Sequence, residues 1–224
     1  MILRPYQDKA VADVRASFGT GARSVLLVAA CGSGKTLMFS HICKLANAKG
    51  NRVVIIAHRD SLVTQASGKL KDCGIKHGII APGYSNCGDT VNVASLMTLI
   101  RRLDQYELDF IIVDEAHRAI SPSYSKIFER YPKAKILGVT ASPCRTNGQG
   151  LDAIFDKMVV GPSISFLVSE GFLVEPLTYG AQKQIDFSNV GMSKGDYDLK
   201  QLADLVDRPG ITGDSIAEYS SICP

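Results

Sequence analysis

Two short strings of residues have the types and the spacing that phosphate chemistry requires. The first, residues 29–36, reads Ala-Ala-Cys-Gly-Ser-Gly-Lys-Thr and directly follows an apolar run. A glycine-rich loop between a strand and a helix presents its backbone N–H groups to phosphate oxygens, and the helix adds the positive end of its dipole. We therefore expect this loop to bind a nucleoside triphosphate. The expected phosphate-binding residues are Cys31, Gly32, Ser33, Gly34, Lys35 and Thr36.

Individual positions of this loop have separate expected roles. Gly32 and Gly34 let the backbone approach the phosphates. Lys35 reaches the β and γ phosphates, and the hydroxyl of Thr36 ligates Mg²⁺. The general pattern begins with glycine, whereas this chain has Ala29, so the loop must turn without a residue free to adopt positive φ there. The alternative is a glycine-rich turn that ends a strand and happens to precede a lysine.

The second string, Asp-Glu-Ala-His at residues 114–117, follows the apolar run Phe110–Val113. Charged residues at the end of a buried strand are costly unless they are paired or bound to a metal. We expect Asp114 to hold Mg²⁺, Glu115 to polarise the attacking water, and His117 to hydrogen-bond a neighbouring strand end. The alternatives are a solvated cap and a structural histidine. Together the two strings predict hydrolysis of the terminal phosphate of a nucleoside triphosphate.

Composition limits the class of protein. The 224 residues carry a net charge of +3, which is too small to indicate nucleic-acid binding without local clustering. Six scattered cysteines form no C-x-x-C pair, so we expect free thiols in a reducing compartment. The apolar runs are no longer than strands and the N-terminus has no signal-peptide pattern. We expect no membrane partner and a cytoplasmic location, or a nuclear one in a eukaryote.

Apolar runs of strand length alternate with helical spacing, which predicts an α/β domain with a mainly parallel sheet. The expected strands are Ser24–Ala29, Arg52–Ala57, Ile79–Ala81, Val91–Ala94, Phe110–Val113 and Lys135–Val139. The expected helices are Tyr6–Phe18, Lys35–Lys49, Ser61–Cys73, Ser95–Leu103 and Pro122–Tyr131. Further on, the pattern predicts helices at Gln149–Phe155, Ser163–Glu170, Leu199–Val206 and Ile216–Ile222, a strand at Val174–Tyr179 and a loop from Gln182 to Gly195.

Four further strings resemble motifs of one family in order and spacing. They are Arg4-Pro-Tyr-Gln7, Ile56-Ala57-His58-Arg59, Val93-Ala94-Ser95-Leu96 and Thr140-Ala141-Ser142-Pro143, the last followed by Arg145. With the phosphate loop and residues 114–117, they resemble the superfamily 2 helicases and translocases of the Asp-Glu-Ala-His type. The resemblance covers residues 3–145. It implies a three-layer, RecA-like P-loop NTPase domain that uses ATP and Mg²⁺ as cofactors.

The resemblance also implies roles for residues outside the two catalytic strings. Arg4 and Gln7 recognise adenine, with Gln7 at the base edge. The implied contacts to the nucleic-acid backbone are made by His58, Arg59, Ser95 and Thr98. The residues implied to couple ATP hydrolysis to movement are Thr140, Ser142 and Arg145. The alternatives are that Ser95 caps a helix, that Arg59 is an ordinary surface arginine, and that Arg145 braces its loop.

The expected organisation is a first motor domain at residues 1–180 and a linker or helical extension at 181–224. Motors of this family carry a second RecA-like domain with a Gln-x-x-Gly-Arg-x-x-Arg string, which this chain lacks. We expect that second domain and nucleic acid as partners, with DNA favoured over RNA because the Arg-Pro-Tyr-Gln form resembles DNA translocases. The alternatives are a nucleotide-binding module without turnover of its own, or another P-loop NTPase or kinase. Gln7 and Thr140-Ala141-Ser142-Pro143 argue against a kinase.

Overall fold

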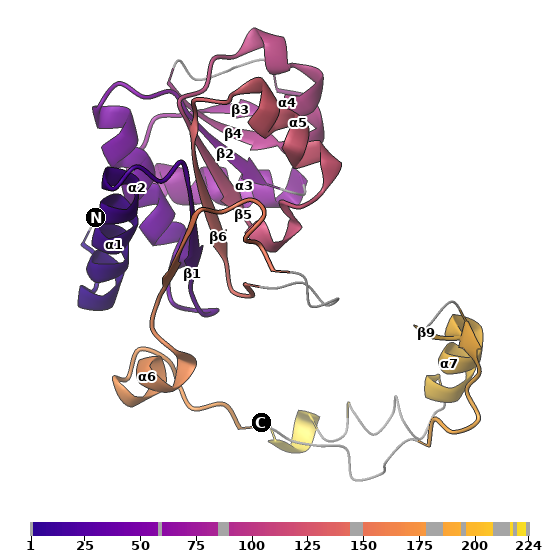
Figure 1. Cartoon of the computed structure of the whole chain (residues 1–224). Coiled ribbons are helices and arrows are strands. Elements are labelled where there is room, and N and C mark those ends of the chain that lie inside the picture. The colour runs from indigo at the N-terminus through magenta and orange to yellow at the C-terminus, as the bar shows by residue number, and fades with distance from the viewer. Residues whose placement is uncertain are drawn as a thin grey trace. The chain divides into compact units, whose positions relative to one another are not determined.

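Seven parallel strands form the central sheet of the computed structural model (Figure 1). They are β1 (Ser24–Val28), β2 (Val53–Ala57), β3 (Gly78–Ile80), β4 (Val91–Ser95), β5 (Phe110–Asp114), β6 (Lys135–Thr140) and β7 (Lys157–Val160). Across the sheet the order is β3-β4-β2-β5-β6-β1-β7, and every neighbouring pair runs parallel. The expected α/β fold with a mainly parallel sheet is therefore confirmed.

The structure describes residues 2–57, 60–84, 90–143, 150–177, 186–193, 196–207, 216 and 219–222. The chain divides into two compact units, Met1–Glu175 and Pro176–Pro224, and each is described by itself. The sheet belongs to the first unit. The expected domain boundary at residue 180 stays a prediction.

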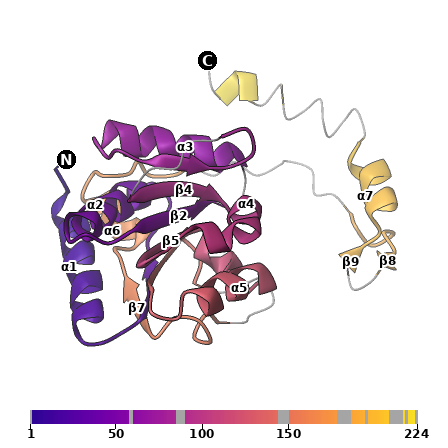
Figure 2. The same ribbon diagram turned by 90° about the horizontal axis from the view of Figure 1, so that it is seen from above.

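Helices cover both faces of the sheet and give the domain three layers. The first face carries α1 (Pro5–Gly19), α2 (Lys35–Ala48) and α3 (Asp60–Asp72), and the second carries α4 (Leu96–Arg101) and α5 (Pro122–Arg130). Figure 2 shows α3 and α5 on opposite sides of the sheet. Successive strand residues enter opposite cores, so Leu27 packs with the first set of helices and Leu26 with the second. Burial on both faces explains why the strands are apolar without alternation.

Three short helices also belong to the first unit. They are η1 (Leu103–Gln105), η2 (Ala116–Arg118) and α6 (Ile164–Ser169). The second unit contains a two-stranded antiparallel ribbon, β8 (Met192–Ser193) and β9 (Asp196–Tyr197), and helix α7 (Leu199–Val206). The side chain of Asp198 caps α7 by accepting hydrogen bonds from the N–H groups of Lys200 and Gln201.

Most elements of the first unit coincide with the expected ones. The six expected strands are β1 to β6, and the first five expected helices are α1 to α5. The helix expected at Ser95–Leu103 ends earlier, at Arg101, and Leu103 begins the separate 3₁₀ helix η1. The expected helices at Ser163–Glu170 and Leu199–Val206 are α6 and α7. In the segment Ile216–Ile222, the described residues 216 and 219–222 are helical.

Three expectations were wrong in the part of the chain that the structure describes. The helix expected at Gln149–Phe155 is absent from residues 150–155, which form a single turn. The N–H of Phe155 donates to the carbonyl of Leu151 and closes this turn, so the apolar pair four residues apart belongs to a turn. Residues 174–177 form no strand, and Val174 is exposed. The expected loop before residue 195 includes β8. Strand β7 was not expected, because only Val159 of its four residues is buried.

Two compositional expectations can also be compared with the described residues. Within the described ranges, no helix combines the length and the apolar character needed to cross a bilayer. The described cysteines Cys31, Cys43 and Cys73 are free thiols, in agreement with the expectation from their spacing. Burial raises the pKa of the Cys43 thiol to about 12, so this thiol stays protonated and inert at neutral pH.

Candidate active site

The loop after β1 has the backbone shape of a phosphate cradle. Gly32 has φ +77° and Gly34 has φ +83°, both in the left-handed region that glycine adopts at little cost. Gly34 is the N-cap of α2, so the first N–H groups of that helix have no partner inside the helix and point into the loop. Ala29 is buried, and its N–H donates to the carbonyl of Thr140 at 2.9 Å. As expected, the loop turns without positive φ at residue 29.

Gln7 connects α1 to this loop. Its Nε2 donates to the carbonyl oxygen of Ser33 at 2.9 Å, and its Oε1 accepts from the backbone N–H of Arg4 at 2.9 Å. Tyr6 donates its hydroxyl to the same Ser33 oxygen at 3.0 Å. A Cβ at residue 34 would overlap Nε2 of Gln7, so a larger residue there would displace the Gln7 amide in addition to straining the positive φ. Both Oε1 and Nε2 of Gln7 therefore form hydrogen bonds with other atoms of the protein. The role of Gln7 at the base edge stays a prediction.

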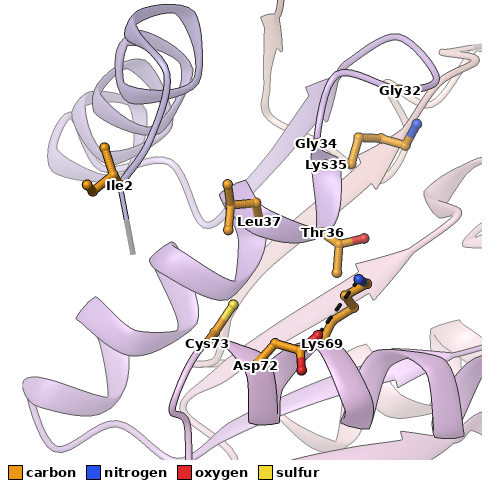
Figure 3. A pocket seen from close by; sticks show the side chains of 9 residues that line it. All are labelled: Ile2, Gly32, Gly34, Lys35, Thr36, Leu37, Lys69, Asp72 and Cys73. Atoms are coloured by element: carbon orange, nitrogen blue, oxygen red, sulfur yellow. Dashed lines mark ion pairs between the residues drawn. The ribbon is translucent and has the colours of Figure 1, made fainter.

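Lys35 and Thr36 begin α2 and face a cavity of about 800 Å³ (Figure 3). The cavity lies between the phosphate loop and the last turn of α3, and it is large enough for a nucleotide. Its lining residues are Ile2, Gly32, Gly34, Lys35, Thr36, Leu37, Lys69, Asp72 and Cys73. Within the described part of the chain, the hydrogen bonds of the Lys35 ammonium are long, 3.3 Å to the carbonyl of Ala29 and 3.4 Å to that of Ala30. Such weak contacts leave this charge free to move to a phosphate.

Asp114 and Glu115 occupy the end of β5 and the turn that follows. Burial raises the pKa of the Asp114 carboxyl, as does the nearby Glu115 carboxylate, while the N–H of Glu115 and the ammonium of Lys35 act in the opposite direction. Among the described residues, Glu115 is the one residue other than glycine with positive φ, at +53°. This conformation costs about 1–2 kcal/mol for a side chain of this kind. Such strain concentrates at functional sites.

His117 joins the turn after β5 to the end of β6. Its Nδ1 lies 3.3 Å from Oε2 of Glu115 and 3.2 Å from Oγ1 of Thr140. Thr140 also donates to the carbonyl of Ser142 at 3.0 Å, and the N–H of Ser142 lies 3.2 Å from the same threonine oxygen. The expectation that His117 reaches a neighbouring strand end agrees with this geometry. One hydrogen-bonded network therefore connects the carboxylate turn with Thr140-Ala141-Ser142.

The structure brings the expected ATP-site residues together at one edge of the sheet. The phosphate loop, Asp114 and Thr140 follow the carboxyl ends of β1, β5 and β6, which are neighbours in the order β5-β6-β1. Ligands of open parallel sheets bind at this edge. Asp114 and Glu115 lie at this edge but are not among the residues that line the cavity beside the phosphate loop. A cation, backbone N–H donors, a hydroxyl and two carboxylates at one sheet edge are the groups needed to bind a nucleoside triphosphate with a divalent cation and to activate water.

The expected nucleic-acid residues are less well placed. Ser95 and Thr98, at the end of β4 and in α4, are 5% and 8% exposed, so their side chains offer little surface to a ligand. Ser95 is the N-cap residue of α4 but makes no capping hydrogen bond through its side chain. His58, Arg59 and Arg145 lie outside the described residues. The nucleic-acid contacts expected of His58, Arg59, Ser95 and Thr98 stay predictions, as does the coupling role expected of Arg145.

Sequence reasoning missed the aromatic group beside Arg4. The ring of Phe172 lies 5.1 Å from the ring of Tyr6, and the guanidinium carbon of Arg4 is 4.7 Å from the Phe172 centroid. Residues 172 and 4 are far apart in the chain, and no local pattern indicates that they meet. The sequence predicted only a strand at Val174–Tyr179 in this part of the chain, and that prediction does not indicate the contact.

A parallel sheet with a phosphate loop after β1 and a carboxylate pair after β5 defines a RecA-like P-loop nucleotide-binding domain. The chain belongs to the family described as "Type III restriction enzyme, res subunit", which matches residues 1–145. Among curated proteins it is 31% identical to the "51.5 kDa protein" of a Lactococcus phage over 192 residues, 84% of this chain and 39% of that one. It is 29% identical over 226 residues to the "Putative ATP-dependent helicase IRC3" of Saccharomyces cerevisiae, covering 92% of this chain and 33% of that protein.

Solved structures share the fold at lower identity. The UvsW helicase of bacteriophage T4 superposes with a TM-score of 0.59 and 18% identity, over 71% of this chain and 60% of that one. The Sulfolobus solfataricus SWI2/SNF2 ATPase core in complex with dsDNA gives a TM-score of 0.53 and 24% identity, over 64% of this chain and 32% of that one. With the family match, these comparisons confirm the resemblance at the level of a superfamily 2 helicase N-terminal domain. The chain spans between a third and two fifths of the two curated relatives above.

Proposed function

We propose that this chain is the first, ATP-binding motor domain of a helicase or translocase. It hydrolyses ATP and drives movement along nucleic acid when it is joined to a second RecA-like domain. One observation carries the proposal: the phosphate loop, the carboxylate pair and Thr140 lie at the ends of β1, β5 and β6, and two contacts join them. His117 connects Glu115 to Thr140, and the N–H of Ala29 in the phosphate loop donates to the Thr140 carbonyl. This arrangement connects the place where phosphate is cut to a segment that the family resemblance assigns to coupling.

The donor set at the strand ends suits Mg²⁺, which prefers hydroxyl and carboxylate oxygens. Thr36 and Asp114 are the residues that would hold the ion. When bound, Mg²⁺ neutralises negative charge on the phosphate oxygens. We assign these two residues as ligands because Thr36 lines the cavity and Asp114 ends β5, which is separated from β1 only by β6.

The protein's own groups perform the remaining steps. Backbone N–H groups of residues 32–36 and the Lys35 ammonium bind the phosphates and stabilise the charge that develops when the terminal phosphate leaves. Glu115 accepts a proton from the attacking water. His117, at 3.3 Å, holds the Glu115 carboxylate in orientation and transmits its position to Thr140.

The proposed partners are a second RecA-like domain of the same polypeptide and nucleic acid, with DNA favoured. Motors of this kind complete the ATP site with an arginine from the second domain, a contribution of about 10³–10⁵ in rate in related NTPases. The relatives named as helicases, and a fold shared with an ATPase core in complex with dsDNA, support this part of the proposal. The finer Asp-Glu-Ala-His subtype belongs to it as well, on the residues 114–117.

Substitution of the loop lysine tests the nucleotide site. Lys35→Ala removes a charged hydrogen-bond donor, so the Kd for ATP measured by calorimetry with Mg²⁺ should rise about 10- to 100-fold. Lys44→Ala, an exposed lysine on the same helix α2, is the matched control and should bind as the wild type does. Unchanged affinity of the Lys35 variant would contradict the site.

A second measurement separates the motor from a nucleotide-binding module without turnover. We expect the chain alone to bind ATP but to release phosphate slowly, with little stimulation by DNA or RNA. The same assay on a polypeptide that includes a second RecA-like domain should give fast, nucleic-acid-stimulated release. Slow, unstimulated release by both would favour the binding module.

A further inference from the structure

Helix α6 ends in a turn whose direction is fixed by hydrogen bonds. Gly171 has φ +70°, its N–H donates to the carbonyl of Val168 at 2.9 Å, and the N–H of Phe172 donates to that of Leu167 at 2.8 Å. This pair of bonds is the Schellman pattern that ends helices at a glycine. At the other end of α6, the hydroxyl of Ser163 accepts from the N–H of Phe166. The helix is therefore held at both ends, and Leu167 anchors it in full burial.

The turn places two apolar side chains against the nucleotide site. Phe172 lies 4.7 Å from the guanidinium carbon of Arg4 and 5.1 Å from the Tyr6 ring. Leu173 packs on the phosphate loop so closely that a Cβ on Gly32 would lie 2.7 Å from its Cδ2. The same short turn thus contacts both the base side and the phosphate side of the expected site.

The contact with Phe172 restricts the conformation of the Arg4 side chain. Its side chain is exposed, and a free arginine loses about 2 kcal/mol of rotamer entropy when it is immobilised. An aromatic ring against one face of the planar guanidinium restricts these rotamers and leaves the other face available to stack on a flat group. The backbone N–H of Arg4 is also held, by Oε1 of Gln7 at 2.9 Å. Both the backbone and the side chain of Arg4 are therefore set before a ligand binds.

We propose that Phe172 is a positioning residue of the nucleotide site, whose ring holds the Arg4 guanidinium ready to stack on the nucleobase of ATP. This inference rests on the proposed function and adds a residue from the turn that follows α6, 168 positions after Arg4 in the chain. The ring acts only on the part of the ligand that Arg4 contacts. Phosphate binding, which depends on Lys35 and the loop N–H groups, does not require it.

A pair of ligands tests this role. Phe172→Ala should raise the Kd for ATP about three- to tenfold, the range expected when a cation–π contact and its ordering effect are lost. The Kd for inorganic tripolyphosphate, which has no base, should stay within about twofold. Phe172→Leu keeps an apolar side chain but lacks the ring, so it should reproduce the loss, whereas Phe172→Tyr should restore wild-type affinity. Phe166→Ala is the control, because Phe166 lies on the preceding helix α6 and is 44% exposed.

The outcomes separate this inference from the proposed function. Wild-type affinity for ATP in both the Ala and Leu variants would overturn the role of Phe172 and leave the ATP site intact. Equal loss of ATP and tripolyphosphate binding would overturn it too, because the turn would then merely support the loop. Failure of the wild-type chain to bind either ligand would overturn the proposed function itself, and the inference with it.

Discussion

A single methyl group added to strand β6 should disturb both the core and the catalytic turn. Gly138 pairs with Val113 of β5 on one side and Leu26 of β1 on the other. A Cβ at this position would lie 2.6 Å from Cε1 of Phe155 and 2.9 Å from the Cβ of Ala116. Phe155 is buried and Ala116 is fully buried, so neither can move into solvent. Gly138→Ala therefore overpacks the core at the place where η2 begins.

The magnitude follows from two opposing effects. Overpacking of a well-filled core costs about 1–3 kcal/mol, and replacing a strand glycine by alanine returns about 0.5–1 kcal/mol through the unfolded chain. We expect a net loss of about 1–2 kcal/mol in the free energy of unfolding. For a domain of this size that corresponds to roughly 2–8 °C in Tm. Because Ala116 directly follows Glu115, turnover should fall by more than the loss of folded protein explains.

Thermal and urea unfolding, with phosphate release measured on the same samples, provide the assay. Gly68→Ala is the control, since its Cβ would have no neighbour within 4 Å and the helix α3 should gain up to about 1 kcal/mol. Phe155→Leu should lower the free energy of unfolding by less in the Gly138→Ala background than in the wild type, because it removes the clashing ring. Equal cost in both backgrounds, or a variant as stable and active as the wild type, would refute the reasoning.

Three further predictions concern other parts of the domain. Glu115→Gln keeps shape but cannot accept a proton, so ATP affinity should change less than about threefold while turnover falls more than about tenfold; turnover above a tenth of wild type would argue for another base. The Arg52 guanidinium, through hydrogen bonds at 2.8 Å, holds the pKa of Asp109 at about 2. This stability is present above pH 4 and is lost as the pH falls towards 2. Urea titrations should therefore show that the free energy of unfolding falls over that range by roughly 1 kcal/mol more in the wild type than in Asp109→Asn, after allowance for solvent screening. Parallel curves of this free energy against pH would exclude the ion pair as the cause. Binding of a single-stranded oligonucleotide, followed by anisotropy, should be weak and should fall steeply between about 50 and 200 mM salt, because the expected contacts are to phosphates; tight, salt-independent binding would indicate base stacking.

The sequence predicted the elements that carry strong local patterns. Runs such as Phe110–Val113 are apolar without interruption because both faces of the sheet are buried, and the phosphate loop is recognisable by glycine spacing alone. Strand β7 was missed because an edge strand with one buried residue leaves no such pattern. The turn at 150–155 was mistaken for a helix because a single helical turn has the same four-residue spacing.

Within the candidate site, the sequence indicates which groups lie at strand ends but gives no signal for contacts between distant segments. Parallel strands end at one edge, so the meeting of Lys35, Asp114 and Thr140 follows from their positions after strands. The contact of Phe172 with Arg4 depends on the path of the chain through β7 and α6, which no local signal encodes. The burial of Ser95 was also not predicted, since a serine at a strand end is usually exposed.

The left-handed backbone of Glu115 has a consequence for directed evolution of this domain. Glycine or asparagine accepts φ +53° more readily than glutamate, so Glu115→Gly and Glu115→Asn should fold at least as stably as the wild type while losing the carboxylate. A library sorted only for resistance to heat would therefore accumulate inactive members at this position. Stability and activity are opposed here at a single residue, and a screen for robust motors must select for phosphate release from the first round.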